Sequence, residues 1–282
     1  MPWNVVTGEC VSLMQTIDDN TIDAIVTDPP YGLAYQGRQW DKLPPGEAWP
    51  NECHRILKPG GHIVAFGSSR TVHRLAVAIE DAGLEVRDSI YWQYYTGFPK
   101  SLSIELEGYQ GYGKPLIGTV AANLEAYGTG ALNVDKCRYR LGDPAWPGPQ
   151  DKQTDKRGRW PSNVYACPKP SRVEKEHGCE GLEGQSKAQM TLRKEGSKGL
   201  NSPRAGAGRT RGNVRNYHPT VKPVKLFAWL VRLVGGDPSS SVILDPFCGS
   251  GTTGIAAVAA GYSFMGFDIS QGYVDISRAR IE

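Results

Sequence analysis

The sequence contains little that would fit a secreted or a membrane protein. Its six cysteines are scattered without a C-x-x-C pair, and no long apolar run occurs in the 282 residues. The chain also does not open with a basic segment followed by a short apolar one, which is the pattern of a secretory leader. We therefore predict a reduced, cytoplasmic protein with no membrane partner.

Two kinds of enzyme site are missing as well. The phosphate-binding pattern G-x-x-x-x-G-K-[ST] is absent, which disfavours the hydrolysis of nucleoside triphosphates. Cys137, Cys167, His177 and Cys179 are candidate zinc ligands by residue type, but their spacing matches no recognised zinc motif, so we expect no metal. The formal net charge of +3 is only mildly basic and does not by itself indicate nucleic acid.

What the sequence does contain is an alternation of strand and helix patterns near both ends. Short apolar, β-branched runs predict strands at 3–7, 23–27, 62–66, 86–92, 241–244 and 262–267. The intervening segments predict helices at 11–17, 47–57, 71–82, 223–234 and 254–260. Lys58-Pro59-Gly60-Gly61 is expected to end the second of these helices. The alternation indicates an α/β fold with a doubly wound, parallel sheet.

The tetrad Asp28-Pro29-Pro30-Tyr31 follows the second predicted strand. Its prolines end the strand, because neither can donate to the ladder, and this puts the tetrad at the carboxyl edge of the sheet, where α/β folds bind ligands. There the Asp28 carboxylate and the Pro29 carbonyl offer two acceptors, and Tyr31 offers an aromatic face. Such a set suits an amine on an aromatic heterocycle. Taken alone, the tetrad is explained equally well as an ordinary strand-ending turn.

A glycine-rich turn, Asp245 to Gly254, follows the strand predicted at 241–244. Its glycines let backbone N–H groups approach a ligand, and the helix that follows favours a carboxylate or a phosphate at its start. Asp268 ends the next strand, where an acidic residue binds the ribose hydroxyls of a nucleoside cofactor. Because the third glycine of a dinucleotide site is missing, S-adenosylmethionine fits best, with its adenine against Phe267 or neighbouring apolar groups.

Regular periodicity is thin between about residues 97 and 217. From Lys187 to Arg215, eight basic residues and five glycines accompany a single acid, Glu195. We interpret this run as a basic arm that contacts DNA phosphates. A solvated, flexible loop is the alternative. The candidate DNA contacts are Arg204, Arg209 and Arg211.

Five motifs in order resemble those of the β-class DNA amino-methyltransferases, the N4-cytosine/N6-adenine DNA methylase family. They are D-P-P-Y, L-K-P-G-G, G-F-P-K-S, H-P-T-V-K-P and D-P-F-C-G-S-G-T-T, and the resemblance covers about residues 3–101 and 214–282. It implies a Rossmann-like, S-adenosylmethionine-dependent methyltransferase sheet that is circularly permuted, so that strand 3–7 pairs beside strand 262–267. It also implies a catalytic half at 1–100, an inserted target-recognition region at 101–213, partly flexible and basic, and a cofactor-binding half at 214–282.

The same resemblance assigns roles to individual residues. Asp28 and the Pro29 carbonyl would hold the exocyclic amine of a base flipped out of DNA, with Pro30 keeping Pro29 extended and Tyr31 stacking on the base. The implied cofactor-binding residues are Glu9, Thr220, Lys222, Asp245, Phe247, Gly249, Ser250, Gly251, Thr252 and Asp268.

The predicted function is site-specific methyl transfer from S-adenosylmethionine to an exocyclic amine of DNA. Adenine N6 is favoured, because in this family an Asp that opens the tetrad goes mostly with adenine. The alternatives are cytosine N4, RNA as the substrate, and, from another class, a catalytically silent DNA-binding protein. DNA is the expected partner, and a homodimer and a cognate restriction endonuclease are left open.

Overall fold

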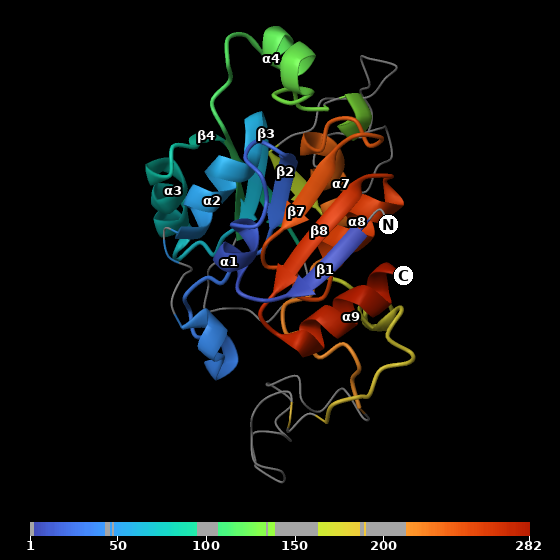
Figure 1. Ribbon diagram of the computed structural model, residues 1–282. Helices are drawn as coiled ribbons and strands as arrows, with labels where there is room; N and C mark the ends of the chain where they lie inside the picture. Colours follow the sequence, from blue (N-terminus) through green and yellow to red (C-terminus); the bar gives the residue numbers. More distant parts are fainter. Residues whose placement is uncertain are drawn as a thin grey trace, which may run out of the picture.

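The computed structural model describes residues 3–42, 46, 48–94, 107–133, 135–138, 163–186, 189 and 213–282. Within these ranges the chain forms one eight-stranded sheet in the order β1-β8-β7-β2-β3-β5-β4-β6 (Figure 1). The strands are β1 (Trp3–Thr7), β2 (Ile22–Thr27), β3 (Leu57–Phe66), β4 (Glu85–Gln93), β5 (Glu107–Gly113), β6 (Val164–Ala166), β7 (Val242–Asp245) and β8 (Ser263–Asp268).

Helices cover both faces of this sheet. They are α1 (Cys10–Met14), α2 (Ala48–Ile56), α3 (Val72–Asp81), α4 (Val120–Tyr127), α5 (Arg172–Glu176), α7 (Val224–Val234), α8 (Thr252–Ala259) and α9 (Gln271–Ile281), with 3-10 turns at Tyr35–Gly37, Gln39–Asp41 and Asp135–Cys137. Ala24 and Val26 belong to the core on the α7 side, whereas Ile25 belongs to the core beneath α1, α2 and α3. Successive strand residues face opposite ways, so β2 is buried on both sides, which explains its unbroken apolar run.

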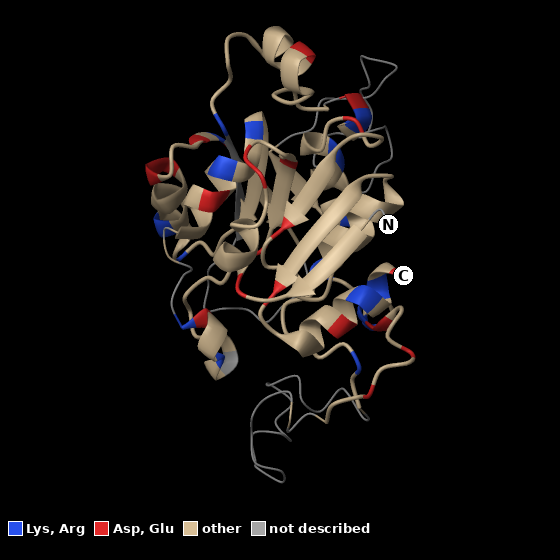
Figure 2. Ribbon diagram, in the orientation of Figure 1, with Lys and Arg blue, Asp and Glu red and all other residues tan. Residues whose placement is uncertain are grey.

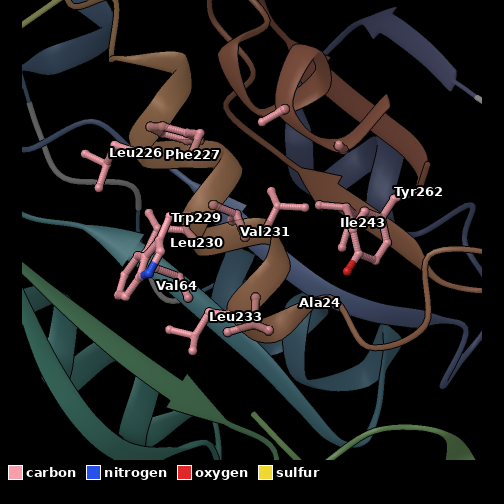
Figure 3. Packing of buried hydrophobic residues seen from close by; sticks show 14 of the residues in the cluster. Ala24, Val64, Leu226, Phe227, Trp229, Leu230, Val231, Leu233, Ile243 and Tyr262 are labelled. Carbon is pink, nitrogen blue, oxygen red and sulfur yellow. The ribbon is translucent and has the colours of Figure 1, made fainter. Parts of the chain in front are cut away.

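The core on the α7 side holds that helix firmly against the sheet (Figure 3). Phe227 stacks on Phe66 of β3 with ring centroids 4.9 Å apart. Trp229 packs on Tyr165 of β6 at 4.9 Å. Because α7 begins just after Lys222, this packing fixes the position of the segment that precedes the helix.

The permuted strand order is confirmed. β1 lies parallel to β8, with Trp3 opposite Phe264 and Thr7 opposite Asp268. β8 pairs in turn with β7, and β7 pairs with β2. The first strand of the chain therefore completes the sheet beside its last strand, and the carboxyl ends of β1, β2, β7 and β8 meet at one edge.

Two expectations about the sheet are corrected. β5 runs antiparallel to both β3 and β4, so the sheet is mixed rather than wholly parallel. The helix ends before Lys58–Gly61 as expected, but the strand predicted at 62–66 begins already at Leu57, so this segment is part of β3, where the register jumps from Ile22–Leu57 to Ala24–His62. Lys58 anchors this bulge by an ion pair to Asp23, with Nζ and Oδ1 2.7 Å apart.

No helix in the described ranges is long and apolar enough to cross a membrane. The same part of the chain contains no group of three or more His, Cys, Asp or Glu side chains that could hold a metal ion. All six cysteines carry free thiols.

Candidate active site

A cavity of about 310 Å³ lies at the carboxyl edge of the sheet. The ends of β2 and β8 supply Asp28 and Asp268 to its wall, and the turn after β1 supplies Glu9. Apolar lining comes from Val11, Trp40, Ala48, Trp49, Pro246, Phe247, Ile269 and Tyr273. The cavity thus joins the sequence-predicted catalytic tetrad to three of the predicted cofactor residues, Glu9, Phe247 and Asp268.

The Asp28 carboxylate binds two partners on its two oxygens. The hydroxyl of Tyr31 donates to Oδ1 at 2.6 Å, and the ammonium of Lys222 forms an ion pair with Oδ2. Lys222 is 8% exposed, and its Nζ lies 5.0 Å from the ring centroid of Phe66 and 5.8 Å from that of Tyr31. The tetrad and the H-P-T-V-K-P motif, nearly 200 residues apart, therefore form one constellation.

Asp41 organises the loop that follows the tetrad. Its Oδ1 accepts hydrogen bonds from the backbone N–H groups of Tyr31 at 2.7 Å and Gly32 at 3.0 Å. Its Oδ2 accepts from the N–H of Tyr35 at 2.8 Å. The side chain is 3% exposed, so a buried carboxylate is satisfied by backbone donors on both oxygens and fixes the backbone that carries Tyr31.

Asp245 lies beneath the glycine-rich turn rather than on the cavity wall. Thr27 and Thr253 donate their hydroxyls to its two oxygens, and the N–H of Phe247 donates to Oδ1 at 3.1 Å. Burial raises the pKa of Asp245 to about 6, and these hydrogen bonds oppose the rise. The residue joins β2, β7 and α8 at the base of the turn.

Asp268 lines the cavity and also holds the turn. Its Oδ2 accepts from the N–H of Gly249 at 3.0 Å, and its Oδ1 accepts from the N–H of Ser270 at 2.8 Å. Burial raises its pKa to about 6, although both hydrogen bonds act in the opposite direction. Each carboxylate oxygen retains a second acceptor site for a ligand hydroxyl.

Glu9 caps α1 and lines the cavity near Asp268, whose backbone oxygen accepts from the N–H of Gly8 at 2.9 Å. Its carboxylate accepts from the N–H groups of Val11 at 3.0 Å and Ser12 at 2.8 Å. Burial alone would raise the pKa of Glu9, but these hydrogen bonds outweigh it and lower the pKa. Trp49 and Phe247 also line the cavity and meet edge to face, with ring centroids 5.3 Å apart, so the lining combines carboxylates with aromatic rings.

The two glycines of the turn are required by positive φ angles and by close neighbours. Gly249 has φ of +53°, and a Cβ there would lie 2.8 Å from Nε2 of His218. Gly251 has φ of +78°, and a Cβ there would lie 2.4 Å from Oγ of Ser277.

His218 accepts a hydrogen bond at Nδ1 from the N–H of Thr220 at 3.4 Å. Burial, followed by the charges of nearby Lys222 and other cations, lowers the pKa of His218 to about 3, so the ring is neutral.

Arg280 is a functional candidate that sequence reasoning missed. It is 5% exposed, and its Nη1 donates to the backbone oxygen of Ser250 at 2.6 Å and to Oγ at 3.1 Å. Its Nη2 donates to the backbone oxygen of Glu174 at 3.2 Å, and Oε1 of Glu174 accepts from the N–H of Val224 at 2.7 Å. Arg280 thus ties the glycine-rich turn to α5 and to the start of α7.

The remaining predicted site residues divide into two groups. Thr252 lies behind the cavity and donates from its hydroxyl to the Lys222 carbonyl at 3.5 Å, so it supports the segment that carries the lysine. The candidate DNA contacts lie outside the described residues; they are Arg204, Arg209 and Arg211. Asp41, His218 and Arg280 had no assigned role, although His218 is the first residue of the H-P-T-V-K-P motif.

Comparison with known proteins identifies the family to which the chain belongs. Residues 22–279 match the family model N6_N4_Mtase, described as DNA methylase. The chain therefore belongs to this DNA methylase family of amino-methyltransferases, as its motifs predicted. The methyl donor of the family is S-adenosylmethionine, which confirms the expected cofactor.

Two curated relatives are type II methyltransferases. M.HinfI of Haemophilus influenzae is 24% identical over 298 residues, which cover 98% of this chain and 67% of that protein. M.HpaI of Haemophilus parainfluenzae is 24% identical over 291 residues, with coverage of 100% and 75%.

Solved structures share the fold along nearly the whole chain. The M1.HpyAVI–SAM complex has a TM-score of 0.55 at 18% identity and covers 99% of both chains. The PvuII DNA methyltransferase, described as cytosine-N4-specific, has a TM-score of 0.56 at 14% identity, with coverage of 99% and 86%. These similarities confirm the predicted Rossmann-like methyltransferase fold.

Proposed function

We propose that this protein transfers a methyl group from S-adenosylmethionine to the exocyclic amine of a flipped DNA base, and that the base is adenine. The observation that carries the proposal is the constellation of Asp28, Tyr31 and Lys222 beside the first cavity, which Asp28 lines. A carboxylate, an aromatic ring and a nearby cation there lie beside a second carboxylate, Asp268, that suits a ribose.

The cavity fits the cofactor by its chemistry. Asp268 would accept hydrogen bonds from the ribose hydroxyls, while Trp49 and Phe247 provide an apolar wall for the adenine ring. Glu9, which also lines the cavity, offers carboxylate oxygens to an amino group. The turn at Gly249–Gly251 would bring its backbone near the methionine end, with Lys222 a partner for the methionine carboxylate.

Asp28 and Pro29 would prepare the target nitrogen. When bound, S-adenosylmethionine supplies a methyl group on a positively charged sulfur. The Asp28 carboxylate and the Pro29 carbonyl would each accept a hydrogen bond from one N–H group of the amine. These two hydrogen bonds would draw the nitrogen lone pair out of conjugation with the ring. The lone pair then points toward the methyl group, and Asp28 lies within reach of the proton that the amine releases.

Lys222 supports this role of Asp28. Its ammonium already donates to Oδ2, so a nitrogen donor fits against this carboxylate. Tyr31 fixes the other oxygen through its hydroxyl and offers its ring to the base. We infer that the incoming amine takes the place of Lys222 on Oδ2, while the lysine turns to the cofactor.

Adenine N6 is proposed because Asp opens the tetrad. The test is to incubate unmethylated duplex DNA with isotopically labelled S-adenosylmethionine, digest the DNA to nucleosides and identify the labelled one. Label in N6-methyladenine supports the proposal, and label in N4-methylcytosine overturns the choice of base. Absence of label from DNA overturns the activity, and an RNA sample and the Asp28→Asn variant serve as controls.

A further inference from the structure

A second cavity, of about 340 Å³, adjoins the first. Both cavities are lined by Pro30 and Gly46, and the second is also lined by Tyr31, Gly67 and the face of α3. The catalytic tetrad therefore forms the partition between two cavities. The first contains the proposed ribose-binding carboxylate, Asp268, whereas the described lining of the second contains no predicted site residue other than those of the tetrad.

The second cavity is positively charged at the end where α3 begins. Arg70, His73 and Arg74 are exposed there, and residues 67–78 include no Asp or Glu. Neither Arg70 nor Arg74 forms an ion pair with any residue that the structure describes. Among the described residues of the cavity wall the only acid is Asp81, at the far end of the helix. In Figure 2 the blue and red parts of the α3 ribbon lie toward opposite ends of the helix.

We propose that this second cavity receives the target nucleotide of DNA and that Arg70 and Arg74 bind the phosphates that flank it. This inference rests on the proposed function and specifies how the substrate enters. A base in the second cavity reaches Asp28 from the side opposite the cofactor, past the ring of Tyr31. A volume of about 340 Å³ lies at the lower end of the range for small-ligand pockets, about 300–1,000 Å³.

The charge of the rim supports this occupant. Phosphate contacts dominate the affinity of proteins for DNA, and they position the strand without reading its sequence. Two arginines that pair with no described acid, Arg70 just before α3 and Arg74 in its first turn, suit the anionic backbone beside a flipped nucleotide. The second cavity adjoins the first at Pro30, and the first is lined by Asp28, the proposed acceptor for the amine.

The first test removes the two charges. Arg70→Gln/Arg74→Gln should weaken binding to duplex DNA and reduce the slope of log Kobs against log salt by about 0.9 for each phosphate that is no longer bound. Its affinity for S-adenosylmethionine, measured by calorimetry, should not change. The matched control is Lys136→Gln/Arg232→Gln, which removes two exposed charges near the C-terminal end of α7 and should bind DNA like the parent. An unchanged DNA affinity and salt slope would overturn the phosphate assignment.

The second test fills the cavity. Ala78 lines it from α3, and Ala78→Phe should lower kcat/KM for DNA at least tenfold while the Kd for S-adenosylmethionine and the circular dichroism spectrum stay those of the parent. Ala121→Phe, on the exposed surface of α4, is the control. Methyl transfer by Ala78→Phe within twofold of the parent overturns the cavity assignment. If the parent itself methylates no DNA, the proposed function has failed, which is a different outcome from either of these.

Discussion

Lys222 and Asp28 form an ion pair across the two halves of the active site. The lysine belongs to the segment that leads into α7, and the aspartate directly follows β2. Both side chains are largely buried, at 10% and 18% exposure, so each depends on the other for charge compensation. We therefore expect the pair to have a structural role that can be separated from the proposed catalytic one.

Removing only one member of this pair should destabilise the protein. Asp28→Ala leaves the Lys222 ammonium buried without its partner, which costs about 3–5 kcal/mol of unfolding free energy. Asp28→Ala/Lys222→Met should recover most of that loss, because no buried charge remains, yet neither variant should transfer methyl groups. Urea unfolding measures the first effect and label transfer the second. Equal stability of parent and single variant would contradict the mutual compensation.

Asp41 should set the activity through the backbone of Tyr31. Asp41→Ala leaves the N–H groups of Tyr31, Gly32 and Tyr35 without their acceptor and should lower stability by about 2–4 kcal/mol. Asp41→Asn keeps one oxygen for Tyr31 and Gly32 and should lose less of both stability and kcat. Asp18→Asn, at an exposed aspartate, is the control. If the Ala and Asn variants of Asp41 behave alike in both measurements, the hydrogen bonds do not fix the loop.

Arg280 should affect cofactor binding without touching the cofactor. Arg280→Met removes the hydrogen bonds to Ser250 and Glu174, and the turn that holds Gly249 loses its support. We expect the Kd for S-adenosylmethionine to rise about tenfold, in line with about 1.5 kcal/mol for a charged hydrogen bond. Arg278→Met is the matched control, because Arg278 lies on the same helix but donates to the Val5 carbonyl of β1. That variant should lose stability while its Kd stays unchanged.

His218 should make stability depend on pH. Its pKa is lowered to about 3 in the folded protein, chiefly by burial, against about 6.5 when unfolded. Below about pH 6.5 the unfolded state therefore binds more protons than the folded state. The unfolding free energy consequently falls as the pH is lowered below that value. Between pH 7 and pH 5 this loss should be about 1–2 kcal/mol.

Urea unfolding should show that the His218→Gln variant lacks this loss of stability between pH 7 and pH 5. Asp245 and Asp268, whose pKa values are raised to about 6 by burial, act in the opposite direction, because they stabilise the protein at low pH and lose that effect as the pH rises through 6. The comparison of variant and parent therefore isolates the histidine. His177→Gln, at an exposed position, should follow the parent curve. A His218→Gln curve parallel to the parent would refute the prediction.

The sequence predicts those features that local pattern decides. β2 and β7 are short apolar runs buried on both faces, and the turn between β7 and α8 needs glycine at two positive φ angles, at Gly249 and Gly251. The tetrad and Asp268 lie at the carboxyl ends of predicted strands, so their place at the edge of the sheet could be predicted as well. For these reasons the motifs alone pointed to residues that the structure brings together on the cavity wall.

Features that depend on distant partners were not predictable in this way. β5 has the sequence E-G-Y-Q-G-Y-G, and its three glycines weaken any strand pattern; pairing with β3 on one side and β4 on the other compensates. Arg280 reaches Ser250, 30 residues away, and Glu174, 106 residues away. No spacing in the sequence signals such contacts, because they form only when the elements have packed.

The pairing of β1 with β8 has a consequence for the order of folding. β1 has no other strand neighbour in the described sheet, so Val5 and its ladder groups wait for Gly266 to be synthesised. At about 5–20 residues per second this interval is roughly 10–50 s. During translation the apolar strand β1 stays unpaired in the meantime, and Glu9, which follows it, joins the cavity only after β8 has been synthesised.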